Sequence, residues 1–167
     1  MSEREFCVDE LKKFVEEFLG RVGYKLKESR PIGFVKPDIH AIRKVNERDY
    51  EIVAVVKEAL DGAVEGFRDL AAARSFLKDA PDYVLVLPPV SEHGLIEFLI
   101  EKQEWYFDIK RQEFMIWLVN PKRGTIDCII GWPKDNDFKA YFSNPELAGF
   151  DSFIGQRASR KIVEEEF

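Results

Sequence analysis

A short apolar run, DYVLVLPP at residues 82–89, constrains the fold more than any other stretch of this chain. It is uninterrupted by polar residues from Tyr83 to Leu87, and two prolines close it. Such a run is typical of a strand that is buried on both faces and lies parallel to a neighbouring strand. Because both faces must then be covered, the run predicts a sheet with helices on each side.

Three stretches with apolar residues at helical spacing are candidates for those helices. They are residues 8–22, about 62–79 and about 91–105. Asp61 and Ser91 are residue types that favour the N-cap position, and each stands where the second or third helix begins. The sequence therefore predicts one helix before the strands and two between them.

Alternating and β-branched segments supply the other strands, and two turn-rich segments join them in pairs. NERD and NPKRG have turn compositions, so each predicts an antiparallel hairpin. The last 35 residues are less periodic, and we expect an irregular, aromatic-rich segment with a charged tail. The predicted strands are 24–27 continued by 32–35, 38–45, 50–58, 82–89, 114–119 and 125–132.

This order of elements predicts an α/β fold with a mixed sheet and helices on both faces. A core of order α-β-β-β-α-β, about residues 5–90, is followed by a helix, a β-hairpin and the irregular C-terminal segment, about 91–167. A chain of 167 residues is long enough for one domain with a real core. We expect residues 1–167 to form a single domain.

Charge limits the kinds of partner that the chain can bind by electrostatics alone. The net charge is −6 and the pI about 5.1, so the composition does not indicate the basic face of a general nucleic-acid binder. A local basic patch is compatible with this charge. Charged residues make up 34% of the chain, which is typical of a thermophile's surface or of a well-solvated small domain.

Cysteine and histidine usage argues against a structural metal and against disulfides. Cys7 and Cys128 stand far apart, and His40 and His93 have no ligand spacing with them. The N-terminal segment lacks the apolar core of a signal peptide, and no apolar run has the ~20 residues of a membrane helix. We expect a cytoplasmic protein with no small-molecule cofactor and no membrane contact.

Two charged residues stand on strands that are otherwise filled with apolar side chains. Alternation places Asp38 and His40 on one face of their strand, and Val55 and Lys57 on one face of the next. With an even hairpin register, Asp38 and Lys57 meet on the same side of the sheet. A carboxylate and a lysine in that arrangement suit metal-assisted hydrolysis, in which the carboxylate holds the ion. The alternatives are that Asp38 only begins a strand and that Lys57 snorkels to water.

The motif Pro37-Asp38, a turn, then Val55-Val56-Lys57, together with the order of elements, resembles the PD-(D/E)XK nuclease superfamily, which has the restriction-endonuclease-like fold. The resemblance covers roughly residues 5–90. Archaeal Holliday-junction resolvases and type II and type IV restriction enzymes are the members that we have in mind. The resemblance implies a phosphodiester hydrolase that depends on Mg²⁺ or Mn²⁺.

Carried over residue by residue, the resemblance makes Asp38 the metal-binding aspartate and Lys57 the catalytic lysine. The backbone carbonyl of Val56 then completes the metal site. Val55 departs from the pattern, because the family has Asp or Glu there. One carboxylate plus one carbonyl is a poor Mg²⁺ site, since the ion prefers several hard oxygens.

Some family members take the missing carboxylate from the following helix, where Glu65 and Asp69 are the candidates in this chain. Glu51 lies six residues from Lys57, about 20 Å along a strand. Glu58 is expected on the opposite face unless a bulge redirects it. Glu65 and Asp69 are also ordinary choices for a solvated helix surface.

Accessory residues complete the predicted site. Glu17 on the first helix matches a place where some family members have a glutamate, and His40 lies on the face of Asp38. Arg68 and Arg74 on the second helix are candidates for phosphate contacts. The ordinary alternatives are a partly buried histidine with a satisfied partner and a solvated helix face.

Two functions follow from these features. The first is a protein derived from a metal-dependent nuclease, degenerate at Val55, that processes or binds DNA or RNA. The second is a catalytically silent pseudo-nuclease that serves as a protein-interaction module or assembles as a homodimer. In the second case, we expect the partner surface to include the second hairpin and the aromatic-rich segment after it.

Overall fold

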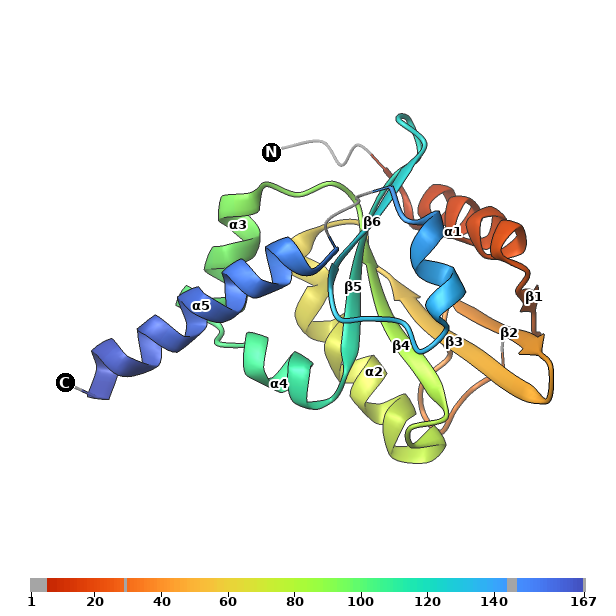
Figure 1. The fold of residues 1–167 in the computed structure, drawn as a ribbon, viewed down its shortest axis with the longest axis horizontal. Coiled ribbons are helices and arrows are strands. Elements are labelled where there is room, and N and C mark those ends of the chain that lie inside the picture. Colours follow the sequence, from red (N-terminus) through yellow and green to blue (C-terminus); the bar gives the residue numbers. More distant parts are fainter. Residues whose placement is uncertain (1–5, 29, 144–146, 167) are drawn as a thin grey trace.

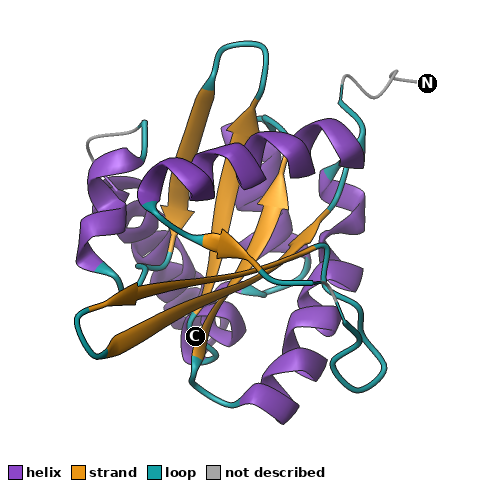
Figure 2. Cartoon of the chain, turned by 90° about the vertical axis from the view of Figure 1, so that its right-hand side faces the viewer, coloured by secondary structure: helices purple, strands orange, loops and turns teal. Residues whose placement is uncertain are grey.

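The computed structural model of the chain describes residues 6–28, 30–143 and 147–166. Its centre is a six-stranded sheet in the order β1-β2-β3-β4-β5-β6, with helices on both faces (Figures 1 and 2). The strands are β1 Lys25–Leu26, β2 Ile39–Val45, β3 Arg48–Val56, β4 Pro81–Leu87, β5 Phe114–Asn120 and β6 Thr125–Ile130.

The helices fall before, between and after these strands. The α-helices are α1 Val8–Val22, α2 Ala63–Leu77, α3 Glu92–Ile96, α4 Tyr106–Arg111 and α5 Leu147–Glu166. Two 3-10 helices, η1 Leu60–Gly62 and η3 Asn136–Tyr141, and one π-helix, η2 Glu97–Lys102, complete them. None of the helices in the described ranges is long and apolar enough to cross a membrane.

The apolar strand that constrained the fold is central. β4 is buried at every position and runs parallel to both β3 and β5, as the uninterrupted apolar run predicted. The segments β1, β2 and β3 pair antiparallel, and β5 and β6 form the second antiparallel hairpin. The predicted α/β fold with a mixed sheet, and its core order α-β-β-β-α-β, are therefore confirmed.

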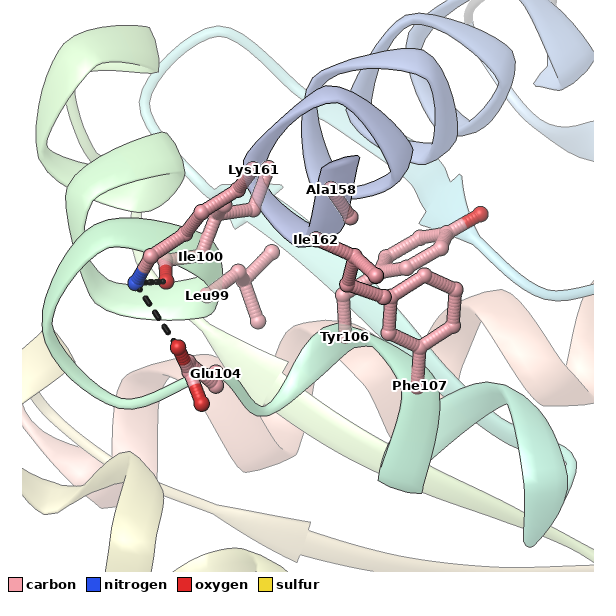
Figure 3. Close-up of a pocket in the computed structure, with 8 residues that line it drawn as sticks. All are labelled: Leu99, Ile100, Glu104, Tyr106, Phe107, Ala158, Lys161 and Ile162. Carbon is pink, nitrogen blue, oxygen red and sulfur yellow. Dashed lines mark hydrogen bonds and ion pairs between the residues drawn. The ribbon is translucent and has the colours of Figure 1, made fainter. Parts of the chain in front are cut away.

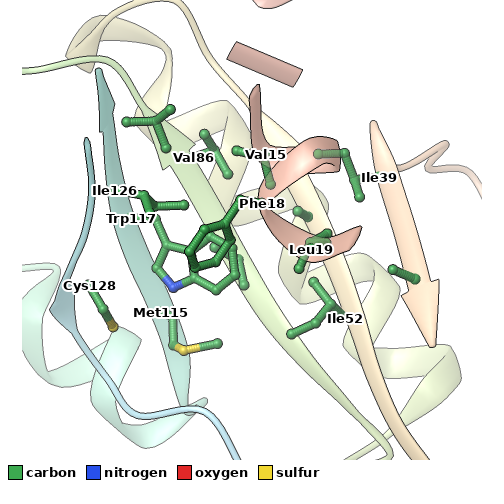
Figure 4. Packing of buried hydrophobic residues seen from close by; sticks show 14 of the residues in the cluster. Val15, Phe18, Leu19, Ile39, Ile52, Val86, Met115, Trp117, Ile126 and Cys128 are labelled. Atoms are coloured by element: carbon green, nitrogen blue, oxygen red, sulfur yellow. The ribbon is translucent and has the colours of Figure 1, made fainter. Parts of the chain in front are cut away.

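Two apolar clusters form the core, one on each face of the sheet. On one face, Phe18 of α1 packs edge-on against Trp117 of β5 and Phe138 of η3, with ring centroids 6.0 and 5.4 Å away (Figure 4). On the other face, α2, η2, α4 and α5 cover β3, β4 and β5. Residues of β3 alternate between the two clusters, since Ala54 and Val56 face α1 whereas Val53 and Val55 face α2.

The first predicted strand is shorter than expected. Lys25–Leu26 pairs with β2, but Ile32 and Val35 form an isolated bridge with each other and add no strand to the sheet. Pro31 has no N–H to donate, and Gly33 has a positive φ of 63°. These two residues favour a tight turn over a continued strand.

The third predicted helix is also divided. The segment 91–105 is α3 followed by the π-helical η2, which ends at Lys102. Glu104 then adopts a positive φ of 54°, which breaks the helix, and α4 begins two residues later. A non-glycine residue with positive φ has no clear sequence signal, and α4 was therefore not predicted.

The C-terminal segment is more regular than the sequence indicated, because α5 is a helix of 20 residues. Its buried residues Asp151, Ile154 and Ala158 follow helical spacing, but glycines hide the pattern. A side chain at Gly155 would place its Cβ 2.9 Å from the hydroxyl oxygen of Tyr106. Gly155 therefore lets α5 approach α4 closely.

Buried polar bonds fix α5 to the rest of the core. The Asp151 carboxylate accepts hydrogen bonds from the Tyr106 hydroxyl at 2.8 Å, from Lys110 Nζ at 2.7 Å and from the Gly131 amide at 3.1 Å. Because Tyr106 and Lys110 belong to α4 and Gly131 follows β6, this carboxylate ties α5 to α4 and to the end of β6. The far end of α5 extends beyond the sheet (Figure 1).

Asp82, at the start of β4, gives stability a pH dependence. Burial raises the pKa of this carboxyl to about 6 from its ordinary 3.8, although the Lys134 amide donates a hydrogen bond at 3.0 Å that opposes the shift. The folded state thus holds the proton more tightly than the unfolded chain. The Asp82 contribution to the free energy of unfolding is therefore largest at pH below 3.8 and is lost as pH rises through about 6.

We expect Asp82→Asn to remove this fall in the free energy of unfolding as pH rises. The asparagine side chain stays neutral at every pH and keeps an oxygen that accepts from the Lys134 backbone amide. The difference between the two proteins should reach about 3 kcal/mol in favour of the variant above pH 6. Urea unfolding at a series of pH values measures it. Parallel pH profiles for the two proteins would contradict the assignment.

Candidate functional site

Asp38 and Lys57 lie at the same end of the β2–β3 hairpin. The antiparallel register pairs Ile39 with Ala54, which places Asp38 opposite Val55. Lys57 follows two residues after Val55, so alternation returns its side chain to the same face. That face is the one covered by α2.

The Asp38 carboxylate is held by the backbone of the neighbouring strand. Its Oδ2 accepts a hydrogen bond of 2.7 Å from the Val56 amide, and its own amide donates to the Ala54 carbonyl at 3.0 Å. Both bonds lie at the end of the β2–β3 ladder. They fix the carboxylate, which is half-buried, beside the residue that precedes Lys57.

The Lys57 side chain crosses under the first turn of α2. A Cβ at Gly62 would lie 3.3 Å from Lys57 Cβ and Cδ, and one at Gly66 would lie 3.5 Å from Lys57 Cγ. Two glycines, four residues apart, thus leave room for the aliphatic stem. This pair of glycines directly after the lysine is a sequence signal for the close approach of α2 to the lysine stem.

The ammonium group of Lys57 reaches both helix carboxylates named from the sequence. Its Nζ lies 3.3 Å from Glu65 Oε1 and 3.9 Å from Asp69 Oδ2. Burial raises the pKa of the Asp69 carboxyl, and the negative charges of Glu65 and Asp38 add to the rise, whereas Lys57 lowers it. The strand and helix carboxylates therefore share one electrostatic environment with the lysine.

Val55 occupies the position at which the motif has its second carboxylate. Its side chain is 2% exposed and belongs to the apolar cluster under α2. A Cβ at Gly66 would lie 3.6 Å from Val55 Cγ2 and 2.6 Å from Leu85 Cδ1, so the helix rests directly on these methyl groups. Val55 is therefore a packed core residue.

The residues of this site do not fit a divalent metal ion in their present arrangement. In the part of the chain that the structure describes, no group of three His, Cys, Asp or Glu side chains is placed to hold one. One oxygen of Asp38 already accepts the Val56 amide, and the Lys57 ammonium lies against both Glu65 and Asp69. Mg²⁺ and Mn²⁺ need several free oxygens around one point.

The two accessory residues, His40 and Glu17, do not contact Lys57 or the helix carboxylates in the interactions of the described part of the chain. His40 Nε2 lies 2.9 Å from Glu51 Oε2, and this hydrogen bond lowers the pKa of the Glu51 carboxyl. Glu17 is exposed on α1, the helix that covers the opposite face of the sheet. The structure thus brings His40 to Glu51 and leaves Glu17 across the sheet from the face of Asp38.

The two arginines of α2 differ in their contacts. Arg74 pairs with Asp79 at 2.7 Å, so its charge is partly matched within the chain. Arg68 is exposed on the helix surface. Their role in phosphate binding stays a prediction.

A separate small pocket lies between η2, α4 and α5 (Figure 3). Its volume is about 140 Å³, and apolar side chains make up most of its wall. At its edge, Lys161 Nζ lies 2.9 Å from Glu104 Oε1 and donates to the Ile100 carbonyl at 2.8 Å. Its lining includes none of the residues of the predicted site; it consists of Leu99, Ile100, Glu104, Tyr106, Phe107, Ala158, Lys161 and Ile162.

A family model matches slightly less than half of the chain. Residues 65–144 match the C-terminal domain of a domain of unknown function, DUF6834. The matched stretch begins at Glu65 and includes Asp69, but Asp38 and Lys57 precede it. No curated protein matches the sequence.

Two solved cyanobacterial structures resemble the chain weakly. An XisH family protein from Nostoc punctiforme PCC 73102 matches with a TM-score of 0.48 and 14% identity, over 75% of this chain and 100% of that one. An fdxN element excision controlling factor protein from Anabaena variabilis matches with a TM-score of 0.44 and 13% identity, over 73% of this chain and 99% of that one. Likenesses at this level support no inference about what this chain does.

Proposed function

We propose that this chain is a restriction-endonuclease-like protein, derived from a metal-dependent nuclease, that binds nucleic acid without hydrolysing it. The observation that supports the proposal is the convergence of Asp38 and Lys57 at one end of the β2–β3 hairpin, with Glu65 and Asp69 of α2 around the lysine. These are residues that the PD-(D/E)XK resemblance named from the sequence.

The absence of hydrolysis follows from Val55. A packed valine stands where the second metal-binding carboxylate belongs, and the lysine pairs with the helix carboxylates. Hydrolysis by an Mg²⁺ or Mn²⁺ ion would require other oxygens to replace the one missing at Val55.

The second candidate is a silent assembly module. Exposed apolar side chains on α5 favour it, since Phe153, Ile162 and Val163 are each more than two-fifths exposed. Trp132, at the end of the second hairpin, is 43% exposed. A protein or a second copy of the chain would cover such side chains, and the net charge of −6 does not oppose it.

One set of assays separates these functions. Binding and cleavage are measured on single-stranded, duplex and branched DNA and on RNA, with Mg²⁺ or Mn²⁺, for the natural chain and for Asp38→Ala. We expect salt-dependent binding by both proteins and cleavage by neither. Asp38→Asn, which keeps the shape and an acceptor for the Val56 amide, controls for local disruption.

Two outcomes would contradict the proposal. Metal-dependent cleavage that disappears in Asp38→Ala would mean that the nuclease is active and that other oxygens replace the one missing at Val55. No binding to any of the nucleic acids, at low salt, would remove the nucleic-acid role and favour the assembly module.

A further inference from the structure

The segment that leads into Asp38 presents a phenylalanine to solvent at the tip of a tight turn. Ile32 and Val35 exchange two backbone hydrogen bonds, with N···O distances of 2.6 and 3.1 Å, and Gly33 and Phe34 lie between them. The exposed fraction of Phe34 is 101%, higher than that of any other large apolar side chain in the described ranges. Nothing within the described chain uses this ring for packing.

The turn is supported from below by α2. Gly33 has a φ of +63°, and a Cβ there would lie 2.2 Å from Cε2 of Phe76, near the end of α2. The Phe76 ring thus lies directly against the turn, and Ile32 packs on the core beside it. Glycine is the residue that both adopts this left-handed backbone and leaves room for the Phe76 ring. The turn therefore holds Phe34 in a defined place.

Basic residues stand on both sides of this ring in the sequence, although the chain as a whole is acidic. Residues 25–36 contain four basic residues and one acidic residue, Glu28, in a chain whose net charge is −6. The four basic side chains are all exposed, and Arg30 pairs with Glu28 at 3.2 Å. The four are Lys25, Lys27, Arg30 and Lys36.

The turn also lies within reach of the candidate site. Phe34 precedes Asp38 by four residues, so their Cα atoms are at most about 14 Å apart. That span corresponds to a few nucleotides of one strand. A strand whose phosphates lie on the lysines would therefore extend from the turn to Asp38 and Lys57.

We propose that Phe34 is a stacking residue for an unpaired base of a nucleic-acid strand, which the exposed Lys and Arg side chains of residues 25–36 hold by its phosphates. An exposed aromatic ring within a basic patch is the combination that binds single strands without regard to sequence. An unpaired base offers a free face to the ring, whereas the bases of a duplex already stack on one another. This inference rests on the proposed function and specifies its substrate as single-stranded or locally unpaired.

Phe34→Ala in the full chain tests the inference, with EDTA present so that no cleavage interferes. We expect affinity for a labelled single strand of DNA or RNA to fall about tenfold, and affinity for a duplex to change little. A strand carrying 2-aminopurine should be quenched by the natural protein and by Phe34→Trp, but not by Phe34→Ala. Phe107→Ala, which removes an exposed ring from α4, is the matched control and should bind normally.

The outcomes separate this inference from the proposed function. If the natural protein binds single strands and Phe34→Ala binds them equally with the same quenching, the stacking role is wrong and the proposed function stands. If the natural protein binds no nucleic acid, both are wrong. Binding to anionic phospholipid vesicles in place of nucleic acid would instead assign the ring and its lysines to a membrane surface.

Discussion

Asp135→Ala should lower the free energy of unfolding by about 3 kcal/mol, because the substitution leaves a guanidinium without its buried partner. Asp135 is 2% exposed, pairs with Arg43 Nη1, and accepts a hydrogen bond of 3.3 Å from the Tyr24 hydroxyl. The Asp135 hydrogen bond raises the pKa of the Arg43 guanidinium, and burial together with the charge of Asp135 raises that of the Tyr24 hydroxyl. The carboxylate therefore joins the end of α1 and the middle of β2 to the start of η3.

Asp137→Ala is the matched control for this prediction. Asp137 also pairs with Arg43, at 3.4 Å, but its side chain is 68% exposed. Solvent screens an exposed pair, so this substitution should cost less than about 1 kcal/mol. Chemical unfolding of both variants compares them, and equal losses would mean that burial of Asp135 contributes nothing.

Much of the core of this fold could be predicted because its strands follow simple patterns. The uninterrupted apolar run became the central parallel strand, and the alternation in 38–45 and 50–58 placed side chains on the faces that they occupy. The register itself was not available from the pattern. It depends on a two-residue turn in which Asn46 adopts a positive φ of 58°.

The predictions that failed involve backbone features with weak sequence signals. η2 is π-helical, and Glu104 has a positive φ without being glycine, so the segment before α4 looked like one continuous helix. Gly155 weakens the helical pattern of the sequence in α5. The close contact between α5 and Tyr106 nevertheless requires a residue without a side chain there. In both places, tertiary packing determines the local structure against propensity.

The residues of the candidate site were named from the sequence, whereas the contacts between them come from the structure. Glu65 and Asp69 were named because they stand on the helix after Lys57, and a spacing of four residues puts both on the side of that lysine. The pairing that makes these carboxylates partners of Lys57, and not of a metal ion, depends on how closely α2 approaches the lysine at Gly62 and Gly66. Sequence patterns do not report that distance.

We propose that the site descends from a metal site that lost its second carboxylate at Val55. Val55 lies opposite Asp38 and two residues before Lys57, on the same face of the sheet. A carboxylate there would add oxygens beside Asp38 and the Val56 carbonyl, as Mg²⁺ or Mn²⁺ requires. In the absence of metal, a charge at this buried position should destabilise the fold by several kcal/mol, on the order of the cost of an unpaired buried charge.

Val55→Glu, measured by thermal unfolding with and without Mn²⁺, tests this claim most directly, with Val55→Gln as the uncharged control of the same shape. We expect Mn²⁺ to stabilise Val55→Glu alone, by about 2.7 kcal/mol when the ion is present at a hundred times its dissociation constant. We expect no such shift for the natural chain or for Val55→Gln. If a folded Val55→Glu gains nothing from Mn²⁺, or if the natural chain gains as much, Val55 is not the place where a metal site was lost.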